Sequence, residues 1–285
     1  MLSNPNLLTD LASNSMNHAR GTFFFREFEE LLLTELPMIH SVISEEKIII
    51  GELGPILFPY FKMGDISSVN LFGLDELVLF AFYFANRARY KKTLDLGANI
   101  GLHTLVMKKL GFETVSYEPD TIHLSQIEKV LELNGFSNDG VRPKAISDHN
   151  GTMEYLRVLG NTTGSHLIGA KENVYGPTDV VAVEVDDILQ VFLDEKFDFV
   201  KMDVEGHEAV LLNRITPESM ICTDIMLEIG SKKNAVEIYR ILGEKKIPAY
   251  SQKNNWGRVQ SLEDLPSHHT QGSLFLSMRG APNWD

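Results

Sequence analysis

The chain has 285 residues, of which 44% are hydrophobic and 23% are charged, as is ordinary for one large globular domain or two small ones. Its formal net charge of −13 argues against a nucleic-acid-binding protein, which needs a basic face to displace counterions from phosphates. The single cysteine, Cys222, excludes an internal disulfide and a zinc site built from cysteines, and its apolar neighbours predict a buried thiol.

Nothing in the sequence predicts a targeting signal or a membrane segment. The first residues lack the basic region and the apolar run of a secretory signal. The longest apolar run, over 77–85, is shorter than a membrane-spanning helix requires. We therefore expect a cytoplasmic protein that does not enter the membrane.

Residues 1–90 are expected to form an N-terminal α+β extension that covers a site on the rest of the chain. Its predicted elements are a weak helical region over 1–45, short strands at 47–50 and 56–61, and a buried helix over 75–89. An apolar face over 23–33 would pack either on the domain or on a second subunit, so a homodimer is one of two expected arrangements.

From residue 91 to 285, short apolar strands alternate with helical segments, which predicts right-handed β-α-β crossovers and a mostly parallel, Rossmann-like α/β sheet. Strands are expected at 92–96, 114–118, 142–147, 180–185, 197–202, 223–229 and 273–278, and helices at 101–110, 121–133, 187–194, 207–214 and 234–243. Residues 151–157 are expected to add one more strand. Residues 161–177, rich in Gly, Asn and Thr, are expected to form a loop over a site.

Ligands of such sheets bind at the carboxyl ends of the strands, and the first strand ends in an acidic, glycine-rich turn. The turn differs from the G-x-G-x-x-G pattern of dinucleotide-binding proteins because Asp95 stands two residues before the first glycine. A carboxylate repels a pyrophosphate but attracts a sulfonium or an ammonium group, so the turn predicts S-adenosylmethionine (SAM) rather than NAD. The predicted cofactor-binding residues of the turn are Asp95, Gly97, Ala98, Asn99 and Gly101.

The next two strands also end in side chains that suit a nucleoside. Glu118 ends the second strand and is expected to accept hydrogen bonds from the ribose diol of the cofactor, although a helix-capping role is the alternative. Ser147 and Asp148 end the third strand. They are equally consistent with binding the adenine amine and with a simple turn before Gly151.

Ionisable side chains crowd the fourth strand end, over 201–208. Asp203 is expected to face the reacting centre, and His207 is expected to take a proton from a hydroxyl group at neutral pH. The predicted substrate-binding residues are Glu205, Glu228 and His166, whereas Glu208 fits either substrate binding or a favourable helix start. The carboxylates are also suitable ligands for a divalent cation, but we expect no metal site.

Together these segments resemble the FkbM-type family of SAM-dependent methyltransferases over about 71–278. The resemblance rests on 95–101, 117–119, 145–148 with Gly151, 161–165, and above all on 201–208. It implies a class I methyltransferase sheet of seven strands whose last strand, at 273–278, is antiparallel. It also implies that Asp95, Gly97, Asn99 and Glu118 bind SAM, that Asp203 lies near its methyl group, and that the acceptor is a sugar, polyketide or similar small molecule.

We therefore expect a small-molecule O-methyltransferase that works by in-line displacement, with Asp203 or His207 as the base. Two alternatives remain open at this stage. One is methylation of a small-molecule amine, which needs less help from a base. The other is a SAM-binding partner protein without catalytic activity.

Overall fold

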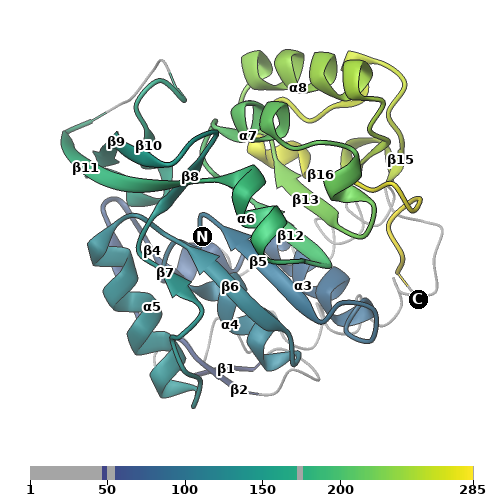
Figure 1. Ribbon diagram of the computed structural model, residues 1–285. Coiled ribbons are helices and arrows are strands. Elements are labelled where there is room, and N and C mark those ends of the chain that lie inside the picture. Colours follow the sequence, from purple (N-terminus) through teal and green to yellow (C-terminus); the bar gives the residue numbers. More distant parts are fainter. Residues whose placement is uncertain (1–46, 50–54, 172–175, 285) are drawn as a thin grey trace, which may run out of the picture.

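The computed structural model describes residues 47–49, 55–171 and 176–284. Its centre is a mixed sheet of eight strands (Figure 1). From edge to edge these are β15 (Gly257–Arg258), β14 (Ala249–Ser251), β16 (Ser273–Leu276), β13 (Asp224–Glu228), β12 (Phe199–Met202), β5 (Lys92–Leu96), β6 (Glu113–Tyr117) and β7 (Val141–Arg142). The strands from β13 to β7 are mutually parallel, whereas β16 is antiparallel to both of its neighbours.

The predicted Rossmann-like α/β fold is thus confirmed, with its last strand inserted antiparallel between β13 and β14. The sheet has eight strands rather than the expected seven, because β14 and the two-residue β15 extend it beyond β16 while the strand predicted at 180–185 lies in a second sheet. Neither β14 nor β15 was predicted, since three and two residues are too few to give an alternating pattern.

Helices cover both faces of the sheet. Successive side chains of a strand point to opposite faces, and the apolar ones on each face need a covering layer. On β13, Ile225 and Leu227 pack into one core and Met226 into the other. The first core is completed by α6 (Ile188–Asp194), α7 (Glu208–Arg214) and α8 (Lys232–Lys245), and the second by α3 (Leu74–Ala85), α4 (Leu102–Lys109) and α5 (Thr121–Leu133). Figure 1 shows α7 and α8 on the side of the sheet opposite to α4 and α5.

A second sheet projects from the domain, in the order β10-β9-β11-β8 (Figure 1). Its strands are β8 (Ala145–Ser147), β9 (Gly151–Val158), β10 (His166–Leu167) and β11 (Thr178–Asp187). The prediction of one strand over 142–147 in the central sheet was wrong. Pro143 has no N–H group to donate, and the chain divides there between β7 in one sheet and β8 in the other. The strand predicted at 180–185 is β11 of this second sheet.

The described part of the N-terminal extension packs directly on the central sheet. It contains β1 (Lys47–Ile49), β2 (Pro55–Leu57), β3 (Lys62–Met63), β4 (Ile66–Ser67) and α3. The ring of Phe82 in α3 lies 5.5 Å from that of Phe199 and 5.6 Å from that of Phe275 between centroids. This helix therefore shares a core with β12 and β16. The helical region predicted over 1–45 and the apolar face over 23–33 lie outside the described residues.

Two smaller expectations have clear outcomes. Cys222 is exposed, so the prediction of a buried thiol was wrong: the residue precedes β13 in a connection that runs over the surface. Among the described residues, no helix is long and apolar enough to cross a membrane.

Candidate functional site

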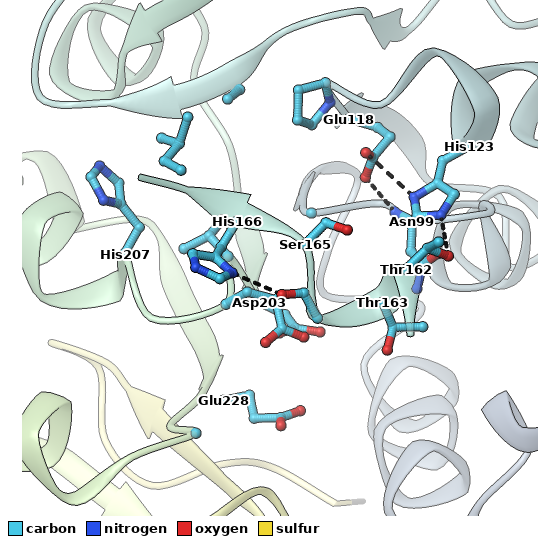
Figure 2. A pocket seen from close by; sticks show the side chains of 18 of the residues that line it. Asn99, Glu118, His123, Thr162, Thr163, Ser165, His166, Asp203, His207 and Glu228 are labelled. Atoms are coloured by element: carbon cyan, nitrogen blue, oxygen red, sulfur yellow. Dashed lines mark hydrogen bonds and ion pairs between the residues drawn. The ribbon is translucent and has the colours of Figure 1, made fainter. Parts of the chain in front are cut away.

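A cavity of about 470 Å³ opens at the carboxyl ends of β5, β6, β12 and β13 (Figure 2). Of the predicted site residues, eight line it: Gly97, Asn99, Glu118, His166, Asp203, Glu205, His207 and Glu228. Five predicted residues do not line it: Asp95, Ala98, Gly101, Ser147 and Asp148. The size lies in the range of small-molecule sites, and the position is the one expected for a ligand of an open α/β sheet.

The turn after β5 is held tightly by its neighbours. Gly97 has φ +75°, and a Cβ added to it would lie 1.8 Å from the main-chain oxygen of Asp203, so only glycine fits. The N–H groups of Gly97 and Ala98 both donate to the carbonyl of Tyr117 at 3.1 and 3.0 Å. Asn99 follows with φ +51°, and its N–H donates to Oε2 of Glu118 at 2.9 Å. The turn is therefore rigid before any ligand binds.

Asp95 lies behind this turn, fully buried, rather than in the cavity. Its Oδ2 accepts a hydrogen bond from Thr104 at 2.7 Å, and its Oδ1 lies 3.8 Å from Nζ of Lys201. Lys201 also lies 3.3 Å from Oδ2 of Asp203 and donates to the Gly97 carbonyl at 3.3 Å. Although burial opposes its charge, Asp203 and Asp95 raise the pKa of Lys201 and keep it protonated. The charge of Asp95 thus acts on the site through Lys201.

Glu118 occupies the predicted place at the end of β6. Its Oε1 accepts the N–H of Asp120 at 2.9 Å, and the Nδ1 atom of His123 lies 3.6 Å from the same oxygen. The Nε2 atom of His123 in turn lies 2.9 Å from Oγ1 of Thr162 (Figure 2). His123 is buried and joins the end of β6 to the segment over the cavity.

Carboxylates dominate the other end of the cavity, where Figure 2 places Glu228 and Asp203. Burial, together with the charges of Asp203 and Glu205, raises the pKa of Glu228 to about 9. Burial and Asp203 also raise the pKa of Glu205, which forms an ion pair with Lys171. The carboxylates therefore oppose one another's ionisation in the free protein, and a cation placed among them would favour the ionised forms.

His207 faces away from this cluster. Its Nε2 atom lies 3.1 Å from Oγ of Ser147, and burial lowers its pKa to about 4. A ring with that pKa is a weak base at neutral pH, and its nearest partner is Ser147 rather than Asp203. Glu208 is structural: it accepts the N–H groups of Val204 and Gly206 at 3.0 and 3.1 Å, which holds the turn before α7.

His166 comes from β10 and lines the cavity from the segment that crosses it. Its Nδ1 atom bonds the carbonyl of Gly164 at 2.8 Å, and burial lowers its pKa. Asp148 lies outside the cavity, and its Oδ1 atom is 2.7 Å from the Nδ1 atom of His149. Because Asp148 does not line the cavity, its position gives no support to the prediction that it binds the adenine amine.

Among the lining residues without a predicted role are Glu76, His123, Tyr155, Thr162 and Lys171. Two of these come from helices α3 and α5, and the other three come from β9 and the connections on either side of β10. The one local feature of the sequence that could have indicated such a residue was the charged Glu76 next to the apolar run of α3. Among the described residues, no group of three or more His, Cys, Asp and Glu side chains is placed to hold a metal ion.

Three observations indicate that the residues lining the cavity suit SAM. Oδ1 of Asn99 is buried without a hydrogen-bond partner in the described structure, although Asn99 lines the cavity, so a donor on a ligand would satisfy it. Glu118 offers carboxylate oxygens where a ribose diol is expected. The lining carries more carboxylates than lysines, which suits a cofactor with sulfonium and ammonium groups and opposes one with a pyrophosphate.

Comparisons with known proteins give one family match. Residues 95–256 match the sequence model of the methyltransferase FkbM domain. Among solved structures, the ribosomal protein L11 methylase of Lactobacillus delbrueckii subsp. bulgaricus is 13% identical, with TM-score 0.38 over 72% of this chain and 78% of that one. A SAM-dependent methyltransferase of Agrobacterium tumefaciens is 11% identical, with TM-score 0.37 over 71% and 61%. No curated protein sequence matches the chain.

Proposed function

Because the chain belongs to the FkbM methyltransferase family, and so is a SAM-dependent methyltransferase, we propose that it methylates a hydroxyl group of a small molecule. The observation that carries this proposal is the acidic cavity at the carboxyl ends of β5, β6, β12 and β13. We propose the extension up to residue 90 as its cover, since Ile66, Asn70, Leu71 and Glu76 line the cavity from that side.

Each part of the cavity is assigned a task. Glu118 binds the ribose hydroxyls, and the main chain from Gly97 to Asn99 lies along the cofactor. When bound, SAM supplies a methyl group on a positively charged sulfur, ready for in-line displacement. Asp203, which faces the cavity and is paired with Lys201, takes the proton of the acceptor hydroxyl. His207 positions Ser147 and the end of β8 instead of acting as the base, which leaves Asp203 in that role.

The acidic surroundings favour a hydroxyl over an amine as the acceptor. Carboxylates stabilise an amine in its protonated form, and a protonated amine has no lone pair with which to attack the methyl group. A neutral hydroxyl escapes this penalty, and its attack is helped by a nearby carboxylate. Incubation with SAM and matched panels of alcohols and amines, read by mass spectrometry, tests the choice. Methylated alcohols support the proposal, methylated amines overturn it, and tight SAM binding without turnover would indicate a non-catalytic partner protein.

Replacing Glu118 with Gln should weaken SAM binding about tenfold to a hundredfold, the usual value of one or two charge-assisted hydrogen bonds. Glutamine keeps the shape of the side chain but loses the charge and one acceptor oxygen. Glu113→Gln is the matched control, because Glu113 lies on the same strand with a side chain that is 73% exposed. Calorimetric titration should show an unchanged Kd for the control. Equal affinities of both variants for SAM would remove Glu118 from the site.

SAM binding should release protons and grow tighter as the pH rises from about 6 to about 9. In the free protein the carboxyl of Glu228, with a pKa of about 9, still holds its proton at neutral pH. A bound cation lowers that pKa, so the complex gives up the proton. Titrations in two buffers of different ionisation enthalpy count the released protons. The release should shrink in Glu228→Gln, and proton uptake by the wild-type protein would contradict the assignment.

A further inference from the structure

Three side chains that the proposed reaction does not use form a hydrogen-bonded chain that ends at the cavity. Oε2 of Glu76 lies 2.6 Å from Nε2 of His103, and Nδ1 of His103 lies 2.9 Å from the hydroxyl of Tyr83. Glu76 and Tyr83 are two turns apart on α3 and therefore share a face, which packs against His103 on α4. Only Glu76 of the three lines the cavity.

The carboxylate end of the chain fixes the direction of the hydrogen bond between His103 and Glu76. Burial raises the pKa of Tyr83 well above its ordinary value, so its hydroxyl keeps its proton, and it lies within hydrogen-bond distance of Nδ1 of His103. An ionised carboxylate only accepts hydrogen bonds, so Nε2 of His103 is the donor to Oε2 of Glu76. Phe80, whose ring centroid lies 5.2 Å from that of His103, packs against the imidazole. One oxygen of Glu76 is thus held by the protein.

The charge of Glu76 differs from that of the other carboxylates in the cavity. Burial opposes its ionisation, but His103 and Lys201 outweigh burial and lower its pKa, whereas the pKa of Glu228 is raised. Glu76 is therefore an anion at neutral pH and a weak base. Its place near Lys201 puts this fixed negative charge at the end of the cavity formed by the Gly97 turn and Asp203.

We propose that Glu76 binds the α-ammonium group of the methionine part of the cofactor, and that His103 and Tyr83 hold the carboxylate in position. This assignment rests on the proposed use of SAM. An ammonium group brings three N–H donors to a carboxylate whose second oxygen has no hydrogen-bond partner among the described residues. A sulfonium group has no such donor and would gain nothing from the fixed orientation. Glu76 is thus a cofactor-binding residue, and His103 and Tyr83 are positioning residues.

Three ligands separate this role from the alternatives. SAM carries both the ammonium and the sulfonium, S-adenosylhomocysteine carries only the ammonium, and 5′-methylthioadenosine carries neither. Calorimetric titration of the full chain should show that Glu76→Gln binds the first two about tenfold to a hundredfold more weakly and the third as wild type does. Tyr83→Phe should follow the same pattern with a smaller loss, of about twofold to fivefold.

Each other outcome overturns the assignment in a distinct way. A loss for SAM alone would place Glu76 at the sulfonium, and an equal loss for all three ligands would make its role structural. Unchanged binding of all three would remove it from the site. Retained binding of 5′-methylthioadenosine also shows that the variant is folded. If the wild-type chain binds none of the three, the proposed function itself fails, which is a separate result.

Discussion

Gly97→Ala should abolish measurable SAM binding, whereas Gly111→Ala should bind SAM as the wild-type protein does. Both glycines have a left-handed backbone, with φ +75° and +87°, so both substitutions carry a similar backbone penalty of about 1–2 kcal/mol. The two positions differ in the room available for a side chain. A Cβ at Gly97 would lie 1.8 Å from the main-chain oxygen of Asp203, while a Cβ at Gly111 would meet nothing within 4 Å. The turn must therefore move only in the first variant.

Titration with SAM, after a thermal melt to establish that each variant is folded, makes the comparison. The melting temperature of Gly97→Ala should fall further than that of Gly111→Ala, because main-chain atoms cannot yield as a flexible side chain does. Wild-type affinity in a folded Gly97→Ala protein would show that the turn after β5 is not part of the cofactor site.

Asp224→Ala should cost about 3–5 kcal/mol of folding free energy, as expected when a buried ion pair loses one partner. Asp224 is fully buried at the start of β13. Its Oδ2 lies 2.9 Å from Arg89, 2.6 Å from Arg279 and 2.7 Å from the Tyr90 hydroxyl. Removing the carboxylate leaves two guanidinium groups without their shared partner, and it unlinks the segment before β5 from the C-terminal segment.

Urea unfolding measures this effect, with Glu237→Ala as the control. Glu237 pairs with Arg240 on the surface of α8, where both side chains are almost half exposed, so the control should leave the free energy of unfolding almost unchanged. Because Asp224 lies at the end of β13 opposite the cavity, saturating SAM should still bind the folded variant. Equal stability of the two variants would show that the buried pair contributes little.

The parts of the site that sequence predicts correctly are those set by local order along the chain. β5 occupies the predicted residues 92–96, and α5 occupies the predicted residues 121–133, capped by Asp120. The turn after β5 and Glu118 at the end of β6 meet in the cavity because parallel strands end at one edge of a sheet. Most of the correctly predicted site residues therefore lie at the ends of strands.

What sequence could not predict depends on packing between distant segments. Glu76 and His123 line the cavity from α3 and α5, and no spacing within either helix predicts that their side chains reach it. Asp95 and His207 stand in the right motifs, but their side chains point to Lys201 and Ser147. A motif fixes where the main chain passes, whereas neighbours in space decide which way a side chain turns.

The central claim is that this cavity binds SAM, and calorimetric titration of the full chain with SAM tests it most directly. The acidic lining, the glycine turn and Glu118 predict one molecule bound per chain, with a Kd of about 1–100 μM, equivalent to about 5.5–8 kcal/mol. Absence of binding at SAM concentrations of about 1 mM, by a chain that melts cooperatively, would contradict the claim.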